Sequence, residues 1–325
     1  MEWGRASVHA CYPEHMAATP HFSSRDQLAA LAIVLIWGLN FVVIKLALRD
    51  FTPFQLGALR FFLAAVPLVF FIKPPQVPWK WLVYFSLGQA LGQFAFLFTA
   101  LQVGMSSALA SVLMQTQVFF TALFAFLALG ERLTRTQWAG LLLSVLGLGC
   151  FAISIVAVDA ENTPAISLIG LVLTLCAAAS WASSNIVARK LREQHPQYDP
   201  LAFTVWASLV PVLPFALGSA LWEPAGSVAS ILQARPSSWL AVLYLGWIAT
   251  VLAYALWTGL LKRHSPNRVA PFALGVPVVG IGAGMLLLGE AITAWQWAGI
   301  GFLGAALVVA VLGPKWMAHR DSSKN

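Results

Sequence analysis

The sequence predicts an all-α integral membrane protein in which ten transmembrane helices form two inverted repeats of five. Three observations predict this fold. Of the 325 residues, 59% are apolar and only 10% are charged, and the mean hydropathy is +0.79. A soluble domain carries about 25% charged residues. In addition, the charged residues lie between long apolar runs, and one twelve-residue phrase occurs twice.

Ten apolar segments are long enough to cross a bilayer, which needs roughly 20 residues per helix. We expect helices at 28–48, 54–72, 81–101, 107–129, 137–157, 166–188, 201–222, 239–261, 269–288 and 295–313. The first segment is too long for a signal peptide and lacks a small-residue cleavage site, so we expect it to remain as a helix. The connections are short, the longest being 158–165 and 223–238, which excludes an inserted soluble domain.

These segments divide the chain into four parts. We expect a tail at 1–26, a first five-helix repeat at 27–157, a second repeat at 166–313 and a tail at 314–325. Met16 is an alternative start to Met1. With the N-terminus inside, the cytoplasmic side holds 15 of the 19 lysine and arginine residues, which is the asymmetry that orients membrane proteins. Both tails are therefore expected to be cytoplasmic.

The repeated phrase reads LGERLTRTQWAG at 129–140 and LGEAITAWQWAG at 288–299. Five helices separate the two copies, and an odd number places them on opposite faces of the membrane. The cytoplasmic copy keeps two arginines that are alanines in the external copy, as the charge rule requires. We expect Glu131 and Glu290 to be structural, capping the N-termini of helices 5 and 10.

Two further echoes support the duplication. WGLNFVVIK at 37–45 is similar to WASSNIVARK at 181–190, and helices 2 and 7 both carry a pair of prolines at the same spacing. In inverted-repeat transporters the substrate site lies near the membrane midplane between the halves. The two halves then rock so that the site opens to each side in turn.

The titratable residues exclude several classes of function. No Asp, Glu or His falls in the middle of a predicted span, whereas proton-coupled transporters commonly use such a group. This argues against a small multidrug exchanger of organic cations and against an intramembrane enzyme, which needs paired catalytic groups. The three cysteines lack metal-site spacing, and the basic residues form no patch for nucleic acid. We therefore expect no catalytic residue, metal, cofactor, nucleic-acid partner or obligate protein partner.

Arg60 is a charge near the middle of helix 2, where insertion costs about 2.5–3.5 kcal/mol. One interpretation makes it a partner for a substrate carboxylate, because a guanidinium offers a planar fork of donors. The alternative is a structural arginine bonded to helix carbonyls or to Asp50 or Asp199. Lys45 lies nearer the end of helix 1, and we expect it to be an interface anchor.

Uncharged amides and aromatic residues at mid-depth are candidates for substrate binding. They are Asn40, Asn185, Gln93, Gln115, Gln117, Trp181, Tyr254 and Trp257. The amides have the alternative role of bridging helices, and the aromatic residues that of packing. Gln115 and Gln117 point about 200° apart on a helix, so at most one of them faces a cavity. Pro271 and Pro277, with several glycines, predict a hinge in helix 9.

Several stretches resemble the drug/metabolite transporter superfamily, EamA type, and the likeness runs from about residue 27 to 313. They are WGLNFVVIK, LRF at 59–61, the two GE turns with QWAG, and VAPFALGVPVVG at 269–280. Within that superfamily the chain is similar to exporters of O-acetylserine and cysteine in enteric bacteria. The stretches that carry this closer resemblance are QFAFLF at 93–98, VLMQTQVFFT at 112–121, SWASSNI at 180–186 and VWASLVP at 205–211.

The resemblance implies a multi-pass protein of the bacterial inner membrane that exports small neutral amino-acid metabolites. It also implies a cavity lined by helices 1, 3, 4, 6, 8 and 9. The sequence departs from many members at Val118, where they carry a proline equivalent to Pro277. Aromatic amino acids, nucleobases or toxic analogues remain alternative substrates, and a channel or an intramembrane enzyme remains an alternative function.

Overall fold

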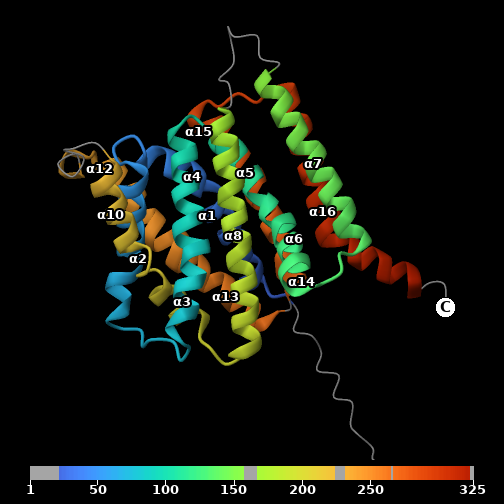
Figure 1. Cartoon of the computed structure of the whole chain (residues 1–325), viewed down its shortest axis with the longest axis horizontal. Helices are drawn as coiled ribbons and strands as arrows, with labels where there is room; N and C mark the ends of the chain where they lie inside the picture. Colours follow the sequence, from blue (N-terminus) through green and yellow to red (C-terminus); the bar gives the residue numbers. More distant parts are fainter. Residues whose placement is uncertain (1–21, 157–166, 224–230, 265, 323–325) are drawn as a thin grey trace, which may run out of the picture.

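The chain folds into a bundle of membrane-length helices (Figure 1). The computed structural model describes residues 22–156, 167–223, 231–264 and 266–322. The predicted N-terminal tail up to residue 21, with Met16, and the predicted loop 158–165 lie outside the described residues. Within the described part every regular element is helical. The predicted all-α membrane fold is confirmed.

In the first half, five helical stretches follow the predicted spans. They are α1 (Ser24–Ala47), α2 (Pro53–Val69), α3 with η1 and α4 (Trp79–Ser86, Leu87–Gly92, Gln93–Gln102), α5 with η2 and α6 (Ser107–Leu113, Met114–Thr116, Gln117–Leu129), and α7 (Arg135–Val156). Four of these are long and apolar enough to cross a membrane, and α2 is a shorter apolar helix.

The second half has the same order of elements. It comprises α8 (Leu168–Gln194), α9 and α10 (Pro200–Ala207, Val212–Trp222), α12 with η3 and α13 (Pro236–Leu243, Tyr244–Leu252, Ala253–Arg263), α14 with η4 and α15 (Pro266–Val269, Ala270–Leu274, Gly275–Leu288), and α16 (Ala294–Ser322). All five stretches contain a span of membrane length. Pro53 and Pro200, predicted as repeat equivalents, both occupy the first turn of a helix, where proline is well tolerated.

Irregular helical turns recur at matching places in the two halves. The third stretch of each half contains a π-helical segment, η1 or η3, and the fourth contains a 3-10 segment, η2 or η4. In η3 the Thr250 hydroxyl donates to the Leu245 carbonyl five residues earlier, a spacing that suits the wider π turn. Such segments occur frequently at functional sites. Pro271 lies in η4 and Pro277 in the first turn of α15, so the predicted hinge region departs from regular α-helix.

The repeated phrase builds the same helix stop and start twice. Gly130 and Gly289 end α6 and α15 with a φ of 66° each, a left-handed conformation that favours glycine. Four residues later a threonine and a glutamine cap the next helix. Gln137 accepts from the Thr134 N–H and donates its own N–H to the Thr134 hydroxyl. Thr293 and Gln296 form the same capping box at the start of α16.

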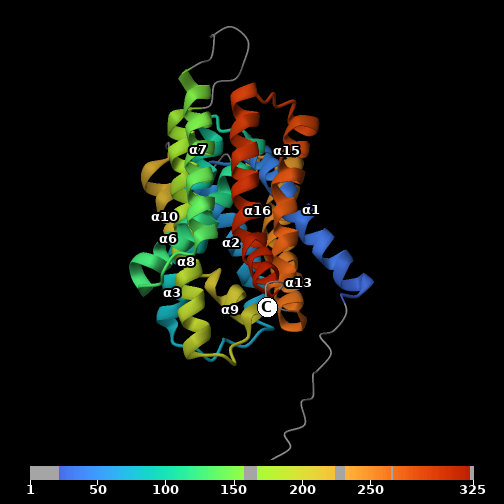
Figure 2. The same cartoon turned by 90° about the vertical axis from the view of Figure 1, so that its right-hand side faces the viewer.

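Helices α7 and α16 lie against each other along one side of the molecule (Figures 1 and 2). Glycines allow this close approach. A Cβ added at Gly299, the last residue of the second phrase, would lie 2.8 Å from the Phe151 ring and 3.0 Å from the Gly147 carbonyl. Phe151 is fully buried. Through Gly299, the repeated phrase therefore also allows α7 and α16, the last helices of the two halves, to pack closely.

Enlarging Gly299 tests this pairing. We expect Gly299→Leu to lower the thermal unfolding midpoint in detergent by several degrees, because overpacking costs about 1–3 kcal/mol. Gly301→Leu is the matched control, since a Cβ at Gly301 meets nothing within 4 Å. Equal midpoints for the two variants would show that α7 and α16 do not depend on this contact.

Candidate functional site

Arg60 lies in the middle of α2 and is 3% exposed. Its Nε donates to the hydroxyl of Thr250 at 3.2 Å, and its guanidinium lies over the ring of Phe94, 4.0 Å from the centroid. Its Nη1 is buried without a hydrogen-bond partner. In the described part of the chain, no carboxylate pairs with Arg60. A buried arginine that lacks a carboxylate and has a free N–H donor can bind an anion.

The alternative that Asp50 or Asp199 binds Arg60 is wrong. Asp50 forms an ion pair with Arg235 at 2.8 Å, and Asp199 lies 4.0 Å from Lys262. Both carboxylates belong to loops between helices, beyond reach of the middle of α2.

A small cavity of about 30 Å³ adjoins Arg60. It combines polar side chains with aromatic walls, and its lining consists of Arg60, Phe61, Phe85, Ser86, Gln89, Ala90, Phe94, Thr204, Ala207, Ser208, Thr250 and Tyr254. These residues come from helices 2, 3, 7 and 8, which the repeat relates in pairs. Of the six helices expected around a central cavity, only helices 3 and 8 line this one. The volume holds one or two water molecules.

A hydrogen-bonded chain crosses the same region. The Gln89 Nε2 donates to the Tyr254 hydroxyl at 2.7 Å, and the Ser184 hydroxyl of α8 donates to the Gln89 Oε1 at 2.8 Å. Tyr254 was predicted as a substrate-binding residue, whereas Gln89 and Thr250 were missed. Gln89 meets the criterion that selected Gln93, an amide at mid-span. Thr250 gives no sequence signal, because threonine commonly bonds within its own helix.

Tyr254 connects these hydrogen bonds to a group of aromatic side chains. Trp37 of α1 lies 5.5 Å from Tyr254 and 5.4 Å from Trp257 between ring centroids. The Trp37 indole also donates to the Ala249 carbonyl at 3.2 Å. Of the predicted aromatic residues, Tyr254 and Trp257 thus both contact Trp37. Trp181 of α8 instead packs against the main apolar core.

The predicted amides fall into two sets. The Asn40 Oδ1 and the Gln93 Oε1 are buried without a partner, which is costly in an apolar interior. Gln115 donates to the Ala273 carbonyl at 3.3 Å, and so bridges helices 4 and 9. Gln117 instead accepts from Asn185 of α8 at 2.8 Å. Gln115 and Gln117 therefore do contact different neighbours, as their spacing predicts.

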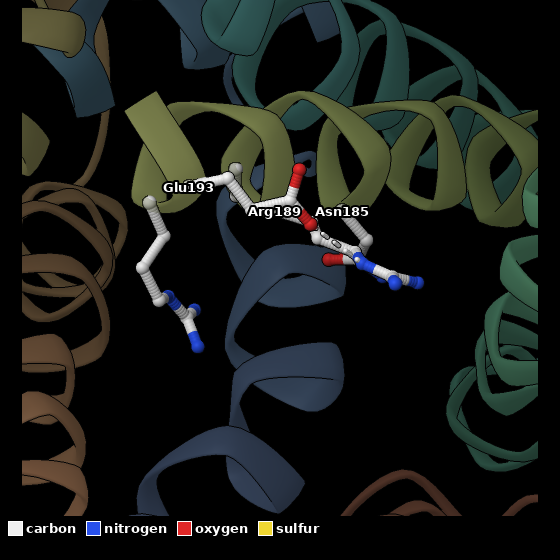
Figure 3. Close-up of a pocket in the computed structure, with 5 residues that line it drawn as sticks. Asn185, Arg189 and Glu193 are labelled. Atoms are coloured by element: carbon white, nitrogen blue, oxygen red, sulfur yellow. Dashed lines mark hydrogen bonds and ion pairs between the residues drawn. The ribbon is translucent and has the colours of Figure 1, made fainter. Parts of the chain in front are cut away.

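A larger cavity of about 420 Å³ lies along α8 (Figure 3). It is lined by Asn185, Ala188, Arg189, Arg192 and Glu193. Asn185, the residue echoed by Asn40, is therefore beside open space and also bonds to Gln117. Its neighbour Ser184 is the residue that bonds Gln89. One turn of α8 thus lines the larger cavity through Asn185 and bonds, through Ser184, to Gln89 in the lining of the small one.

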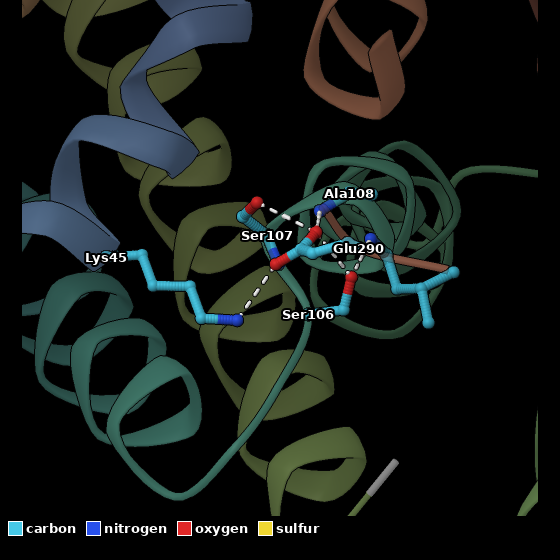
Figure 4. Close-up of polar contacts among 6 residues, drawn as sticks. Lys45, Ser106, Ser107, Ala108 and Glu290 are labelled. Atoms are coloured by element: carbon cyan, nitrogen blue, oxygen red, sulfur yellow. Dashed lines mark hydrogen bonds and ion pairs between the residues drawn. The ribbon is translucent and has the colours of Figure 1, made fainter. Parts of the chain in front are cut away.

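Glu290 links α1 and α5 at one end of the bundle, which we call the Lys45 end (Figure 4). Its carboxylate accepts from Lys45 at 2.8 Å, from the hydroxyls of Ser106 and Ser107, and from the N–H groups of Ser107 and Ala108. Its side chain is 9% exposed. The expectation that Glu290 caps helix 10 is wrong: it caps α5, the start of helix 4. Lys45, predicted as an interface anchor, is the ion-pair partner of Glu290.

Glu131 makes the equivalent contact at the opposite end, which we call the Arg189 end. It pairs with Arg189 of α8, and Arg189 also bonds Glu193 at 3.3 Å. The expectation that Glu131 caps helix 5 is wrong as well, since Thr134 and Gln137 do so. The side chains of Glu131 and Arg189 are 40% and 48% exposed. The duplicated glutamates thus make one buried pair and one exposed pair.

The surroundings of Glu290 change its pKa. Burial is the largest influence and alone would raise the pKa, but the hydrogen bonds from Lys45, from the N–H groups of Ala108 and Ser107 and from the Ser106 hydroxyl outweigh it. The net result is a pKa below the ordinary value of 4.5. The carboxylate therefore stays charged throughout the physiological range.

Known proteins resemble this chain over most of its length. Residues 26–153 and 168–312 match the model of the EamA-like transporter family. The chain is 41% identical to a "probable amino-acid metabolite efflux pump" of Salmonella typhimurium and 37% identical to one of Escherichia coli, covering 90% of this chain and at least 96% of each relative. One crystal structure shares the fold with a TM-score of 0.60 at 21% identity, over 90% of this chain and 99% of the other.

Neutralising each duplicated glutamate tests the difference between the two ends. We expect Glu290→Gln to lower the unfolding midpoint in detergent by on the order of 5 °C, because it leaves Lys45 and the α5 terminus without an anion, at a cost of about 3 kcal/mol. Glu131→Gln is the matched control and is expected to cost less than about 1 kcal/mol, as exposed pairs do. A larger effect of Glu131→Gln would contradict this assignment.

The pH dependence of stability gives an independent check. Because the folded-state pKa of Glu290 lies below its ordinary value of 4.5, its contribution is full above that pH and is lost as the pH falls through the lowered value. The difference in midpoint between wild type and Glu290→Gln should be constant from about pH 7 to about pH 4.5 and shrink below. A difference that shrinks between about pH 6 and pH 5 would contradict the lowered pKa.

Proposed function

Because the chain belongs to the EamA-like transporter family, we propose that it exports small amino-acid metabolites, of the O-acetylserine and cysteine kind, by alternating access. The relatives named as amino-acid metabolite efflux pumps support a metabolite exporter. The single observation that supports the substrate class is the buried Arg60 with its unpartnered Nη1. Every amino-acid metabolite with a free carboxylate offers the planar acceptor that this donor lacks.

The groups around Arg60 supply the remaining contacts of the proposed site. The Tyr254 hydroxyl accepts from Gln89, so its own proton is free to donate to a second carboxylate oxygen. Phe61, Phe85 and Phe94 provide apolar walls for a short side chain. Asn40 and Gln93 are further amide candidates, each with an unpartnered oxygen.

Binding of a metabolite requires the helices around Arg60 to separate, because the present cavity of about 30 Å³ is too small. Two π-helical segments lie at the proposed site. Gln89 lies in η1 and Thr250 in η3, and such segments occur frequently at functional sites. The site would thus form as the two halves rock.

The charge distribution supports an orientation in the membrane. Lysine and arginine concentrate at the Arg189 end, and by the positive-inside rule we propose that this end is cytoplasmic. The larger cavity lies at this end, whereas the Lys45 end is held by the five hydrogen bonds of Glu290. Opening of the external side would require the release of Lys45 and of α5 from Glu290.

An enzyme or a channel is less well supported than a transporter. Among the described residues no group of three or more His, Cys, Asp or Glu could hold a metal ion, and the two cavities lack a nucleophile with an adjacent base. Aromatic amino acids and nucleobases remain alternative substrates on the same scaffold. Nucleobases lack the carboxylate that Arg60 is proposed to bind.

Transport by purified protein tests the proposal. Proteoliposomes loaded with O-acetylserine, cysteine, an aromatic amino acid or a nucleobase should exchange the first two with external label, and Arg60→Gln should reduce the exchange at least tenfold. Arg49→Gln is the matched control, since Arg49 is exposed in a loop. Exchange of nucleobases alone, or full activity of Arg60→Gln, would refute the proposed site.

A further inference from the structure

Three hydroxyl groups belong to the lining of the small cavity and use their protons within the protein. They are those of Ser86 at the end of α3, of Thr204 in α9 and of Ser208 directly after α9. Ser86 donates to the Ala207 carbonyl at 2.7 Å. Thr204 donates to the Pro200 carbonyl and Ser208 to the Thr204 carbonyl, both at 2.8 Å. Because a hydroxyl has one proton and two lone pairs, each of these oxygens can only accept a hydrogen bond from a ligand.

These hydroxyl groups lie together. Thr204 and Ser208 are four residues apart, so they lie on one face of the helix that α9 forms. The bond from Ser86 to the carbonyl of Ala207 places the end of α3 against the residue before Ser208. Ser86 and Ser208 are buried, with exposures of 0% and 5%. Helices 3 and 7 thus contribute three acceptors to the lining, which we call the hydroxyl cluster.

Helices 2 and 8 contribute the donors of the same lining. Arg60 keeps an unpartnered Nη1, and the Tyr254 hydroxyl, which accepts from Gln89, keeps its own proton. The Thr250 hydroxyl is already engaged, since it accepts from Arg60 and donates to the Leu245 carbonyl. The twelve lining residues include no Asp or Glu. The cavity therefore combines a guanidinium and a phenol as donors with three neutral oxygens as acceptors.

A zwitterionic amino acid matches this division of donors and acceptors. Its carboxylate offers only acceptor lone pairs, and its ammonium offers three N–H donors. Three hydroxyl oxygens are as many acceptors as one ammonium can use. When the carboxylate lies against Arg60, it also separates the ammonium from the guanidinium, so that the nearest charge to each cation is negative.

From this division we infer that the hydroxyl cluster binds the α-ammonium of the substrate and so selects amino acids whose amino group is free. This rests on the proposed function of Arg60 as the carboxylate site, and adds the residues that recognise the other charged group of the substrate. Asn40 and Gln93, whose side-chain oxygens also lack a partner, do not belong to the lining of this cavity. The hydroxyl cluster, in contrast, shares one cavity with Arg60.

Loss of either charged group from the ligand has a specific penalty. An open site exposes the hydroxyl oxygens to water, and a ligand that displaces this water must replace its hydrogen bonds. A carboxylate without an ammonium leaves the three oxygens unpaired, and a site built to bond a substrate N–H rejects the analogue that lacks it. An amine without a carboxylate brings a second cation to Arg60 with no anion to separate the two.

Competition among three compounds of similar size tests the inference. Proteoliposomes of the full chain exchange labelled cysteine, under reducing conditions at neutral pH, in the presence of unlabelled cysteine, 3-mercaptopropionate or cysteamine. The second compound lacks the ammonium of cysteine, and the third lacks its carboxylate. We expect each analogue to require a concentration at least tenfold higher than cysteine for half-maximal inhibition, because each leaves one part of the site unpaired.

Removal of single hydroxyl groups assigns the effect to the cluster. Thr204→Val and Ser208→Ala should each reduce the preference for cysteine over 3-mercaptopropionate at least threefold. The preference for cysteine over cysteamine should stay unchanged, because both compounds carry the ammonium. Thr204→Ser retains the hydroxyl and should keep the wild-type preference. Ser154→Ala is the matched control, since the Ser154 hydroxyl also donates to a carbonyl of its own helix, α7, outside the cavity.

The outcomes separate the two proposals. Equal competition by cysteine and 3-mercaptopropionate, or an unchanged preference in both Thr204→Val and Ser208→Ala, would overturn the role of the hydroxyl cluster. With cysteamine still a weak competitor, the carboxylate site at Arg60 would stand. Equal competition by cysteamine and cysteine would overturn the site at Arg60 and with it the inference, and absence of exchange of both cysteine and O-acetylserine would overturn the exporter itself. The wild-type competition decides the matter even where a variant does not fold.

Discussion

The absence of water from the membrane interior is the constraint on which this structure depends. Every buried polar group must find a partner within the protein or bear a penalty of several kcal/mol. Most groups satisfy this rule through hydroxyl-to-carbonyl bonds and bridges such as Gln89 to Tyr254. Arg60 is the buried charged side chain that keeps a donor without a partner in the described part of the chain. Several uncharged groups, such as the Asn40 and Gln93 oxygens, also lack a partner, but Arg60 is the one with a full positive charge at mid-helix, between residues of both halves.

The two halves share geometry and differ in charge. The glycine stop, the capping box, the π turn of the third stretch and the 3-10 turn of the fourth are all duplicated. The duplicated glutamates, however, meet Lys45 in a buried network at one end and Arg189 in an exposed pair at the other. Arg60, seven residues after Pro53, has as its counterpart the uncharged Ala207, seven residues after Pro200. In the proposed mechanism the duplicated scaffold rocks between two states, and the unequal charges distinguish its two ends.

The sequence predicts the fold well because the bilayer limits the choices. Span length and the repeated phrase were sufficient for ten helical stretches, most of whose ends lie within about four residues of the predicted ones. The exceptions are α8, which continues to Gln194 beyond the predicted end at 188, and α16, which continues to Ser322 beyond the predicted end at 313. Contacts between distant elements were less predictable. The length of the first span places Lys45 near a helix end. Its partner Glu290 lies in the turn between α15 and α16, and only the fold shows that the two residues meet. Asn185 stays a predicted substrate-binding residue, and its bond to Gln117 depends on how α6 packs on α8. Thr250 was not predicted as a contact of Arg60, because a buried threonine has no distinctive sequence pattern.

The central claim is that Arg60 binds the substrate carboxylate, and a structure of the protein with bound O-acetylserine tests it most directly. The account predicts the carboxylate within hydrogen-bond distance of the Arg60 Nη1, with the Tyr254 hydroxyl donating to it and with a cavity larger than the present 30 Å³ or so. A ligand bound only in the larger cavity beside Asn185, with Arg60 still on Thr250 and Phe94, would contradict it.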